Sequence, residues 1–274
     1  MFKIIIMALL IFIGMVGYDS ITDKAQPTTP VQQEQQKVSK HEKSAAMALF
    51  TSLLPPKEEW PSPVHKFYLA FNMDEVIDPI RQNPNWTSLD AMSRDIPQAL
   101  IAIEDHAFYN HGAIAVEGIL RATLANINAG EVVQGGSTLT QQFVKNIFLS
   151  HEQSMERKIE EAVLSLMLED NYSKDEILEL YLNTTYFGAG STGIKQASRT
   201  YFGKAPSALT LAEAAVIASL PYAPTSLNPL ENPEGCKNGQ LLVLAAMHKY
   251  GMINQGQLAE AKAEKIRLTN GTVM

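Results

Sequence analysis

The chain has 274 residues, of which 46% are hydrophobic and 19% charged, a composition typical of a globular protein with one or two domains. Its formal net charge of −7 argues against a general nucleic-acid-binding protein, so an anionic substrate would need a local cluster of cations. The single cysteine, Cys236, excludes an intrachain disulfide, and a buried thiol is the simplest interpretation.

An uninterrupted apolar run at residues 4–17 follows Lys3. As a helix, residues 1–18 would span about 27 Å, near the lower limit for crossing a bilayer. The run is either an uncleaved membrane anchor or the apolar part of a signal peptide. Because we find no small-x-small cleavage pattern before Asp19, we favour the anchor. Both interpretations predict that the rest of the protein is exported.

The next segment, residues 19–55, is predicted to be a flexible tether, rich in Gln, Thr, Pro and Lys, followed by a short apolar helix. From Ser88 onward the pattern is helical almost throughout, and no run alternates strongly enough to require a sheet. We therefore expect a mainly α domain at residues 56–266 and a C-terminal tail at 267–274. Helices are expected at residues 88–104, 116–127, from 137 or 138, 154–170, 173–183, 210–220, 233–250 and 255–263, with capping boxes at Ser173/Glu176 and Thr210/Glu213.

The first chemically suggestive motif is Glu104-Asp105, at the end of an apolar run. A carboxylate beside apolar surface can have a raised pKa, which suits a general base, although adjacent acids at a helix end are also common on surfaces. His106 and His111 suggest metal ligation, but their spacing of five does not place them on one helical face. A structural hydrogen bond from His111, next to Gly112, is the simpler interpretation.

The second motif starts with Gly135-Gly136 before a predicted helix. Backbone N–H groups at such a helix start favour an anion. One face of that helix carries a hydroxyl, two carboxamides and an amine, with no acid, and is either a phosphate-binding face or an ordinary solvated one. These residues are Thr138, Gln141, Gln142 and Lys145.

The third motif places Arg157, Lys158 and Glu161 on one face of the next helix, with Glu160 on a different side. It is either a surface ladder of ion pairs, worth a few tenths of a kcal/mol per pair, or part of an active site. Together the three motifs place acids on both sides of a polar, cationic segment of the sequence. Glycosyl transfer from a diphosphate needs such a set: a carboxylate takes a proton from a sugar hydroxyl and cations hold the departing pyrophosphate.

In this order the motifs resemble those of the peptidoglycan glycosyltransferase family (glycosyltransferase family 51), which comprises monofunctional transglycosylases and the transglycosylase modules of class A penicillin-binding proteins. The resemblance covers residues 89–263. The family usually carries an arginine pair where Lys237-Asn238-Gly239-Gln240 stands here, and the serine acyl-enzyme signature of penicillin binding is missing. The chain therefore resembles a monofunctional enzyme or a shortened bifunctional one. Further matching blocks are Ser173-Lys174, Ile177-Leu178-Glu179, Tyr181-Leu182-Asn183, Tyr201-Phe202-Gly203-Lys204, Leu220-Pro221 and Asn228-Pro229.

The resemblance implies a mainly α, lysozyme-like fold of two lobes behind an N-terminal membrane anchor, on the extracytoplasmic side of the bacterial cytoplasmic membrane. It implies polymerisation of lipid II into β-1,4-linked glycan strands, with inversion and release of undecaprenyl diphosphate. Glu104 matches the family's general base and Glu161 its second essential acid. The matching substrate-binding residues are Asp105, Phe108, His111, Ser137, Thr138, Gln142, Lys145, Asn146, Arg157 and Lys158.

No cofactor is required by these motifs and no separate metal motif occurs, although a divalent cation, Mg or Mn, could assist the diphosphate as in some relatives. The expected partners are lipid II, the growing glycan strand, the membrane and cell-wall synthesis proteins, and not nucleic acid. Two other classes stay open. A lysozyme-like peptidoglycan-cleaving enzyme would explain two acids but not the cationic Gln-Gln-Lys stripe. A non-catalytic scaffold subunit would not need the motif acids and cations, all of which are present.

Overall fold

The computed structural model describes residues 68–119, 135–149 and 154–274, and the observations below concern these residues. The chain divides into two compact units, residues 1–77 and 78–274. Every candidate site residue belongs to the second unit. The predicted anchor at residues 1–18 and the tether and short helix at 19–55 lie outside the described residues. Within the described ranges, no helix combines the length and apolar character needed to cross a bilayer.

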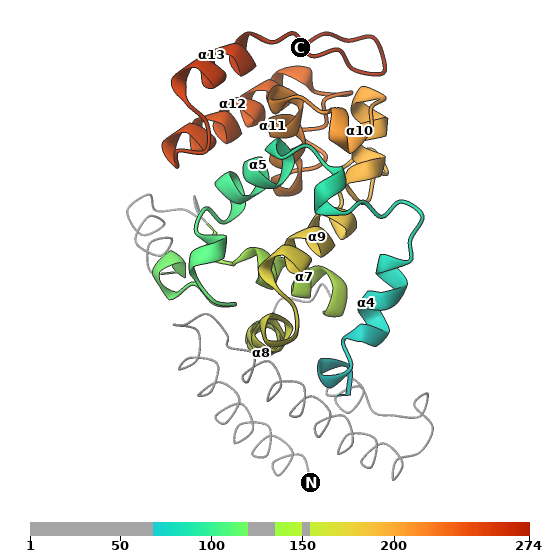
Figure 1. Cartoon of the computed structure of the whole chain (residues 1–274), viewed down its shortest axis with the longest axis vertical. Coiled ribbons are helices and arrows are strands. Elements are labelled where there is room, and N and C mark those ends of the chain that lie inside the picture. The colour runs from blue at the N-terminus through green and yellow to red at the C-terminus, as the bar shows by residue number, and fades with distance from the viewer. Residues whose placement is uncertain (1–67, 120–134, 150–153) are drawn as a thin grey trace. The chain divides into compact units, whose positions relative to one another are not determined.

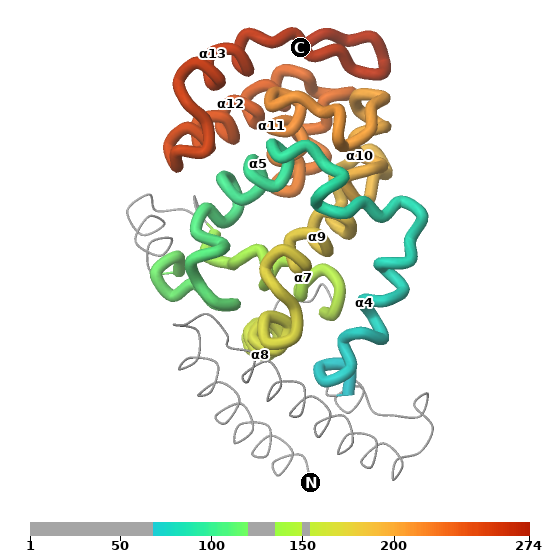
Figure 2. Tube along the Cα trace, viewed as in Figure 1, coloured from blue at the N-terminus to red at the C-terminus, as the bar shows by residue number. Residues whose placement is uncertain are grey.

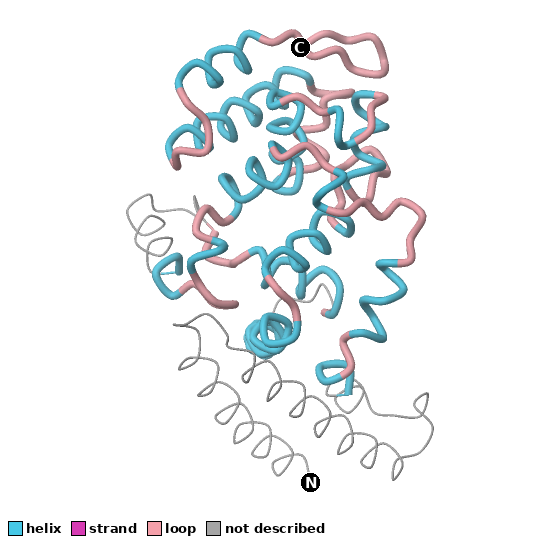
Figure 3. Tube along the Cα trace, in the orientation of Figure 1, coloured by secondary structure: helices cyan, strands magenta, loops and turns pink. Residues whose placement is uncertain are grey.

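The described residues are mainly helical, as the sequence predicts (Figure 1). Backbone β pairing in these ranges is limited to isolated bridges between Tyr186 and Thr192 and between Arg267 and Val273, and Figure 3 draws helices and loops. The helices are α4 (Asp74–Arg81), α5 (Asp95–Glu104), α7 (Leu139–Phe148), α8 (Met155–Asn171), α9 (Lys174–Thr184), α10 (Ile194–Phe202), α11 (Leu211–Ser219), α12 (Pro233–Lys249) and α13 (Gln255–Ala263), with short 3-10 turns η2 (Leu89–Ala91), η3 (Phe108–Asn110), η4 (Pro206–Ala208) and η5 (Leu220–Tyr222).

Side-chain caps fix where several helices begin. The predicted capping boxes at Ser173 and Thr210 are confirmed, because each hydroxyl accepts the N–H three residues on and that residue's side chain returns a bond. Thr138, and not Ser137, caps α7 in the same way. The prediction of one helix from Ser88 to residue 104 is wrong. Ser88 precedes only η2, and α5 begins later, without a side-chain cap.

Two groups of helices build the described part of the second unit. In the first, α11 packs against both α5 and α12, and α13 packs on α12. In the second, α7 packs against α8 and α9, which follow it in the chain (Figure 2). The apolar side chains of α7 point into this second group, where Leu139 and Phe143 are fully buried. This packing turns the start of α7 toward the C-terminal end of α5, where the candidate site lies.

Small residues let α11 and α12 approach closely. α11 contributes buried alanines, and Gly239 of α12 lies against Ser219 at the end of α11. A Cβ atom on Gly239 would lie 3.0 Å from both Cβ and Oγ of Ser219. That separation is shorter than ordinary van der Waals contact, so a side chain at position 239 would force the two helices apart.

Replacing Gly239 by leucine should therefore lower the free energy of unfolding by about 2–3 kcal/mol, because overpacking outweighs the gain in helix propensity. Urea denaturation of the two proteins would measure the difference. Ala245→Leu, on the exposed side of the same helix, is the matched control and should change stability by less than about 0.5 kcal/mol. Equal stability of Gly239→Leu and the parent chain would contradict the close approach.

Candidate active site

A chain of hydrogen bonds links three helices at the C-terminal end of α5. Gln142 of α7 donates from Nε2 to Oε2 of Glu104, the last residue of α5, over 2.9 Å. Tyr181 of α9 donates from its hydroxyl to Oε1 of Gln142 over 3.0 Å. The predicted pair of Glu104 and Gln142 is thus brought together. Tyr181, which the motif analysis did not single out as a site residue, completes the chain.

The environment of Glu104 shifts its acidity in the direction expected of a base. Burial raises the pKa of Glu104 above its ordinary value, and the hydrogen bond from Gln142 and the charge of Lys145 oppose that rise. The neighbouring carboxylate of Asp105 adds a smaller upward effect on the same pKa. A carboxylate that has lost part of its hydration but retains one donor binds a proton more readily than an exposed one.

Asp105 ties the loop after α5 to the start of α7. Its Oδ2 accepts the backbone N–H of Leu139 at 3.1 Å, and its Oδ1 lies 2.6 Å from Nε2 of His111. Nδ1 of His111 lies 2.6 Å from the carbonyl oxygen of Gly112, so both ring nitrogens face acceptors. These contacts raise the pKa of His111, with the Asp105 hydrogen bond as the largest cause. The structural role predicted for His111 is confirmed.

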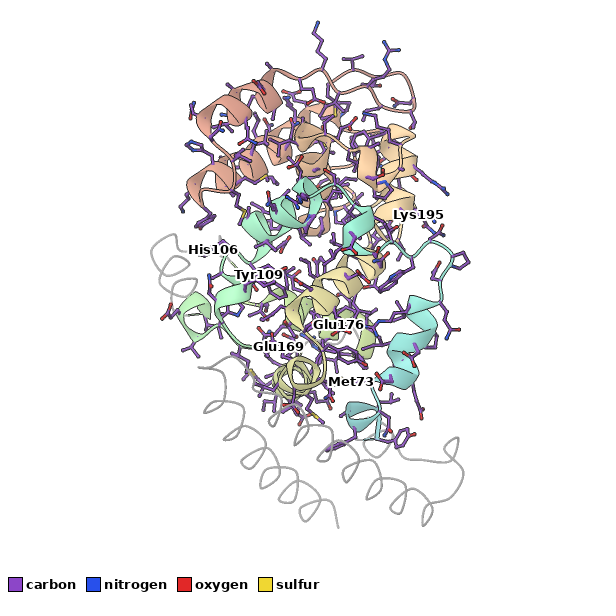
Figure 4. The ribbon with its side chains drawn as sticks, in the orientation of Figure 1. Met73, His106, Tyr109, Glu169, Glu176 and Lys195 are labelled. Carbon is purple, nitrogen blue, oxygen red and sulfur yellow. The ribbon has the colours of Figure 1, made fainter. Side chains whose placement is uncertain are left out.

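The same loop is held from α9. Phe108 is fully buried, with Nζ of Lys174 lying 4.3 Å from its ring centroid. Tyr109 donates from its hydroxyl to Oδ1 of Asp175 over 2.7 Å. Lys174 also donates to Oε1 of Glu169 over 2.7 Å, and Figure 4 labels Tyr109 and Glu169 near the junction of α8 and α9. Phe108 and Tyr109 therefore hold the loop against the start of α9.

A second acid lies at the start of α8. Glu161 is only 1% exposed, and its two carboxylate oxygens contact Nζ of Lys158 and, at 3.2 Å, Nη1 of Arg157. Lys158 also donates to Oγ of Ser137 over 2.9 Å, which joins this cluster to the residue before the α7 cap. A fully buried carboxylate with two cations is not a surface ladder of ion pairs, so the spacing is better explained as part of a site.

Arg157 retains unused hydrogen-bonding capacity. Its Nε is buried and has no acceptor among the described residues, although Nη1 reaches Glu161. A buried donor without a partner costs free energy, and an anion arriving beside it would remove that cost. This geometry suits a phosphate oxygen.

The other polar residues of interest on or next to α7 are of two kinds. Thr138 and Gln141 are buried and form the capping box, and Thr138 also donates to the carbonyl oxygen of Ala113 over 2.8 Å. The side chain of Gln141 therefore serves the helix start, and neither alternative given for this face, a phosphate-binding or a solvated one, describes it. Lys145 and Asn146 are exposed on the next turn, where a ligand could reach them.

Two acids are thus linked to α7 and the residue before it: Glu104 through Gln142, and Glu161, with its two cations, through Lys158 and Ser137. This set of groups suits group transfer on an anionic substrate. Residues 73–248 match the protein family described as Transglycosylase. The chain therefore belongs to the transglycosylase family, and its enzymatic class is that of a peptidoglycan glycosyltransferase.

Individual relatives agree with this membership. The chain is 40% identical over 194 residues to a protein of Cupriavidus necator provisionally named a transglycosylase, with 71% of this chain and 84% of that protein covered. It is 44% identical over 185 residues to penicillin-binding protein 1A of Neisseria flavescens, covering 68% of this chain and 23% of the relative. The match to penicillin-binding proteins thus spans about a quarter of their length.

A crystal structure of penicillin-binding protein 1A from Haemophilus influenzae is 32% identical where it matches and covers 48% of this chain and 16% of that one. Its TM-score of 0.34 is too low to compare the folds. The mainly α prediction is confirmed by the described helices themselves, whereas the lysozyme-like, two-lobed architecture stays a prediction.

Replacing Asp105 by asparagine should lower the pKa of His111 toward its ordinary value of about 6.5, because the neutral amide no longer favours the imidazolium. Because the pKa of His111 is higher in the folded protein than in the unfolded chain, its protonation stabilises the folded protein. This stabilisation is complete at pH values below the pKa of the unfolded chain and is lost as the pH rises through the pKa of the folded protein. The stability difference between the two proteins should therefore shrink at alkaline pH.

NMR titration of the His111 ring protons and denaturation at several pH values would measure both effects. Tyr109→Phe, which removes the bond to Asp175 from the same loop, should leave the His111 pKa unchanged. An unchanged His111 pKa in Asp105→Asn would contradict the ion pair.

Proposed function

We propose that this protein polymerises lipid II into β-1,4-linked glycan strands, with inversion at the anomeric carbon and release of undecaprenyl diphosphate. The observation that carries the proposal is that both acids are linked to the first half of α7: the desolvated Glu104 through Gln142, and the buried Glu161 through Lys158, which bonds to Ser137 just before the helix. The growing strand would be the donor and lipid II the acceptor.

In the proposed reaction Glu104 takes the proton from the 4-hydroxyl of the acceptor GlcNAc as that oxygen attacks the anomeric carbon of the donor. The new C–O bond forms as the bond between the anomeric carbon and the diphosphate oxygen breaks, and attack from the opposite face gives inversion. Burial favours this role because it raises the proton affinity of the carboxylate.

The leaving diphosphate needs no proton if cations neutralise its developing charge. We assign this task to Lys145, Arg157 and Lys158. Glu161 would hold Arg157 and Lys158 in place before the substrate binds. The unpartnered Nε of Arg157 supports this assignment. Ser137, which accepts a bond from Lys158, would lie beside the diphosphate.

A divalent cation, Mg or Mn, would add positive charge to the diphosphate. Both oxygens of Glu161 are engaged by Lys158 and Arg157, so such an ion would bind chiefly through the phosphate oxygens. The described residues contain no group of three or more His, Cys, Asp or Glu side chains able to hold a metal ion.

The proposal includes a location. The apolar run at residues 4–17 would anchor the chain, with residues 78–274 on the extracytoplasmic side of the bacterial membrane, where lipid II and the growing strand are embedded. A peptidoglycan-cleaving enzyme is less well supported, because it would account for two acids but has no use for a buried acid that holds two cations.

Glu104→Gln should reduce turnover about a hundredfold or more, because the amide keeps the shape of the side chain but cannot accept a proton. Labelled lipid II in detergent, with product strands separated by length, would measure the loss. Glu260→Gln, an exposed change on α13, is the control and should retain full activity. Near-normal polymerisation by Glu104→Gln would exclude it as the base, and release of sugar ends from finished glycan would favour the hydrolase instead.

Arg157→Met should lower kcat/KM for the donor roughly tenfold to a hundredfold, because the transition state loses a cation. Binding of undecaprenyl diphosphate should weaken in parallel, which isothermal titration in detergent would detect. Arg199→Met on α10, also an arginine-to-methionine change but at an exposed position, should alter neither value. If Arg157→Met binds the diphosphate as tightly as the parent chain, the assignment of Arg157 fails.

A further inference from the structure

The proposed mechanism gives no task to Tyr181, although its phenol is 1% exposed and lies within the site. The Tyr181 hydroxyl is 3.0 Å from Oε1 of Gln142, and Nε2 of Gln142 is 2.9 Å from Glu104. The Gln142 carboxamide is therefore held between a phenol and a carboxylate that come from two other helices, α9 and α5.

The chemistry of these two neighbours selects one orientation of the amide. A carboxylate only accepts hydrogen bonds, so the amide must turn its NH₂ group toward Glu104. Burial and the charge of Glu104 raise the pKa of Tyr181 above its ordinary value, so the phenol keeps its proton and acts as a donor. The Tyr181 hydroxyl therefore favours an orientation with the amide oxygen toward it. Both neighbours of Gln142, Glu104 and Tyr181, thus select the same orientation of the carboxamide.

We propose that Tyr181 is a positioning residue that fixes the orientation of the Gln142 carboxamide, so that its NH₂ group and not its oxygen faces Glu104. The inference rests on the proposed role of Glu104 as the base. Tyr181 would act on the reaction through Gln142.

The orientation matters because it decides which protonation state of Glu104 the Gln142 amide stabilises. With NH₂ toward Glu104, the amide stabilises the ionised carboxylate, the form a base requires. With Oε1 toward Glu104, it would accept a hydrogen bond from a protonated carboxyl and stabilise the inactive form. The Tyr181 hydroxyl opposes that second arrangement, because the flip would turn the NH₂ group of Gln142 toward its proton and leave only the neighbouring Thr185 hydroxyl to accept it.

Other groups near Glu104 are unchanged by a substitution at Tyr181. Lys145 of α7 lowers the pKa of Glu104 and Asp105 raises it. Two helices pack on α5 from the other side, α11 and α12. The buried titratable groups of these two helices are Glu213, which is paired with Lys204, and the Cys236 thiol, whose pKa is raised by burial to about 12. The His106 ring stacks on the Tyr250 ring at the end of α12.

The test is the pH dependence of kcat/KM for lipid II in Tyr181→Phe. Without the phenol, Gln142 can turn, and the acidic limb of the profile should move up by about one pH unit. Activity should therefore fall about tenfold below the limb and far less above it. Tyr201→Phe is the matched control: its buried hydroxyl on α10 donates to the carbonyl oxygen of Phe187 over 2.7 Å, so its loss should leave the limb in place.

A second variant identifies Gln142 as the intermediary. In a Gln142→Met background no amide can turn, so adding Tyr181→Phe should shift the limb no further. If Tyr181→Phe lowers activity equally at all pH values, or shifts the limb equally in both backgrounds, Tyr181 does not act through the amide and the inference is overturned.

A readout that needs no turnover separates this inference from the base assignment. Infrared difference titration of the carboxyl band of the full chain, with Glu104→Gln as the blank, gives the pKa of Glu104 directly. A higher pKa in Tyr181→Phe supports the inference, and an unchanged pKa overturns it. If Glu104→Gln remains active while this pKa moves, the base assignment fails and the positioning of Gln142 still holds.

Discussion

The site depends on the carboxylate of Asp105. One of its oxygens accepts the first backbone N–H of α7, which is 34 residues further along the chain, and the other contacts the His111 ring in the loop after α5. Glu104 is its immediate neighbour and ends α5. The position of the proposed base relative to α7 therefore follows from a charge-assisted contact next to it, stronger than an ordinary amide hydrogen bond.

Three glutamates of the second unit have side chains at most 3% exposed and a lysine partner each. Glu161 contacts Lys158, Glu169 contacts Lys174 and Glu213 contacts Lys204. Removing one member of such a pair would leave a desolvated charge, which is far more destabilising than the loss of a surface pair. The three pairs differ in purpose. Glu213 also belongs to a capping box and Glu169 supports the loop through Lys174, whereas Glu161 holds the cations beside the proposed diphosphate site.

Local patterns in the sequence were enough to predict the helical class and several helix starts. The pairs Ser173/Glu176 and Thr210/Glu213 form capping boxes because the interaction is complete within four residues. The same locality also sets a limit. A helical face cannot reveal whether a polar residue in the first turn serves the backbone or a ligand, and Gln141 serves the backbone.

Tertiary properties lay beyond the sequence pattern. The spacing of Arg157 and Glu161 fits an exposed ladder as well as a buried cluster, and only the packing of α8 distinguishes them. The contact of Tyr181 with Gln142 joins helices whose relative placement no periodicity encodes. The family resemblance supplied Glu104, Gln142 and Glu161 as site residues, but not the order in which their hydrogen bonds connect.

The cluster at the start of α8 has a further property, because acid and cations stand on successive turns of one helix. Glu161 acts as an internal counter-ion for Arg157 and Lys158, so one of their two positive charges is compensated before a substrate binds. An incoming diphosphate would exchange for this counter-ion, and its binding free energy would reflect the difference between two ion pairs, not the full attraction of bare cations. Such an exchange favours release as well as capture. In the proposed reaction one leaving group must depart before each new addition, and Arg157 and Lys158 would then re-form their ion pairs with Glu161.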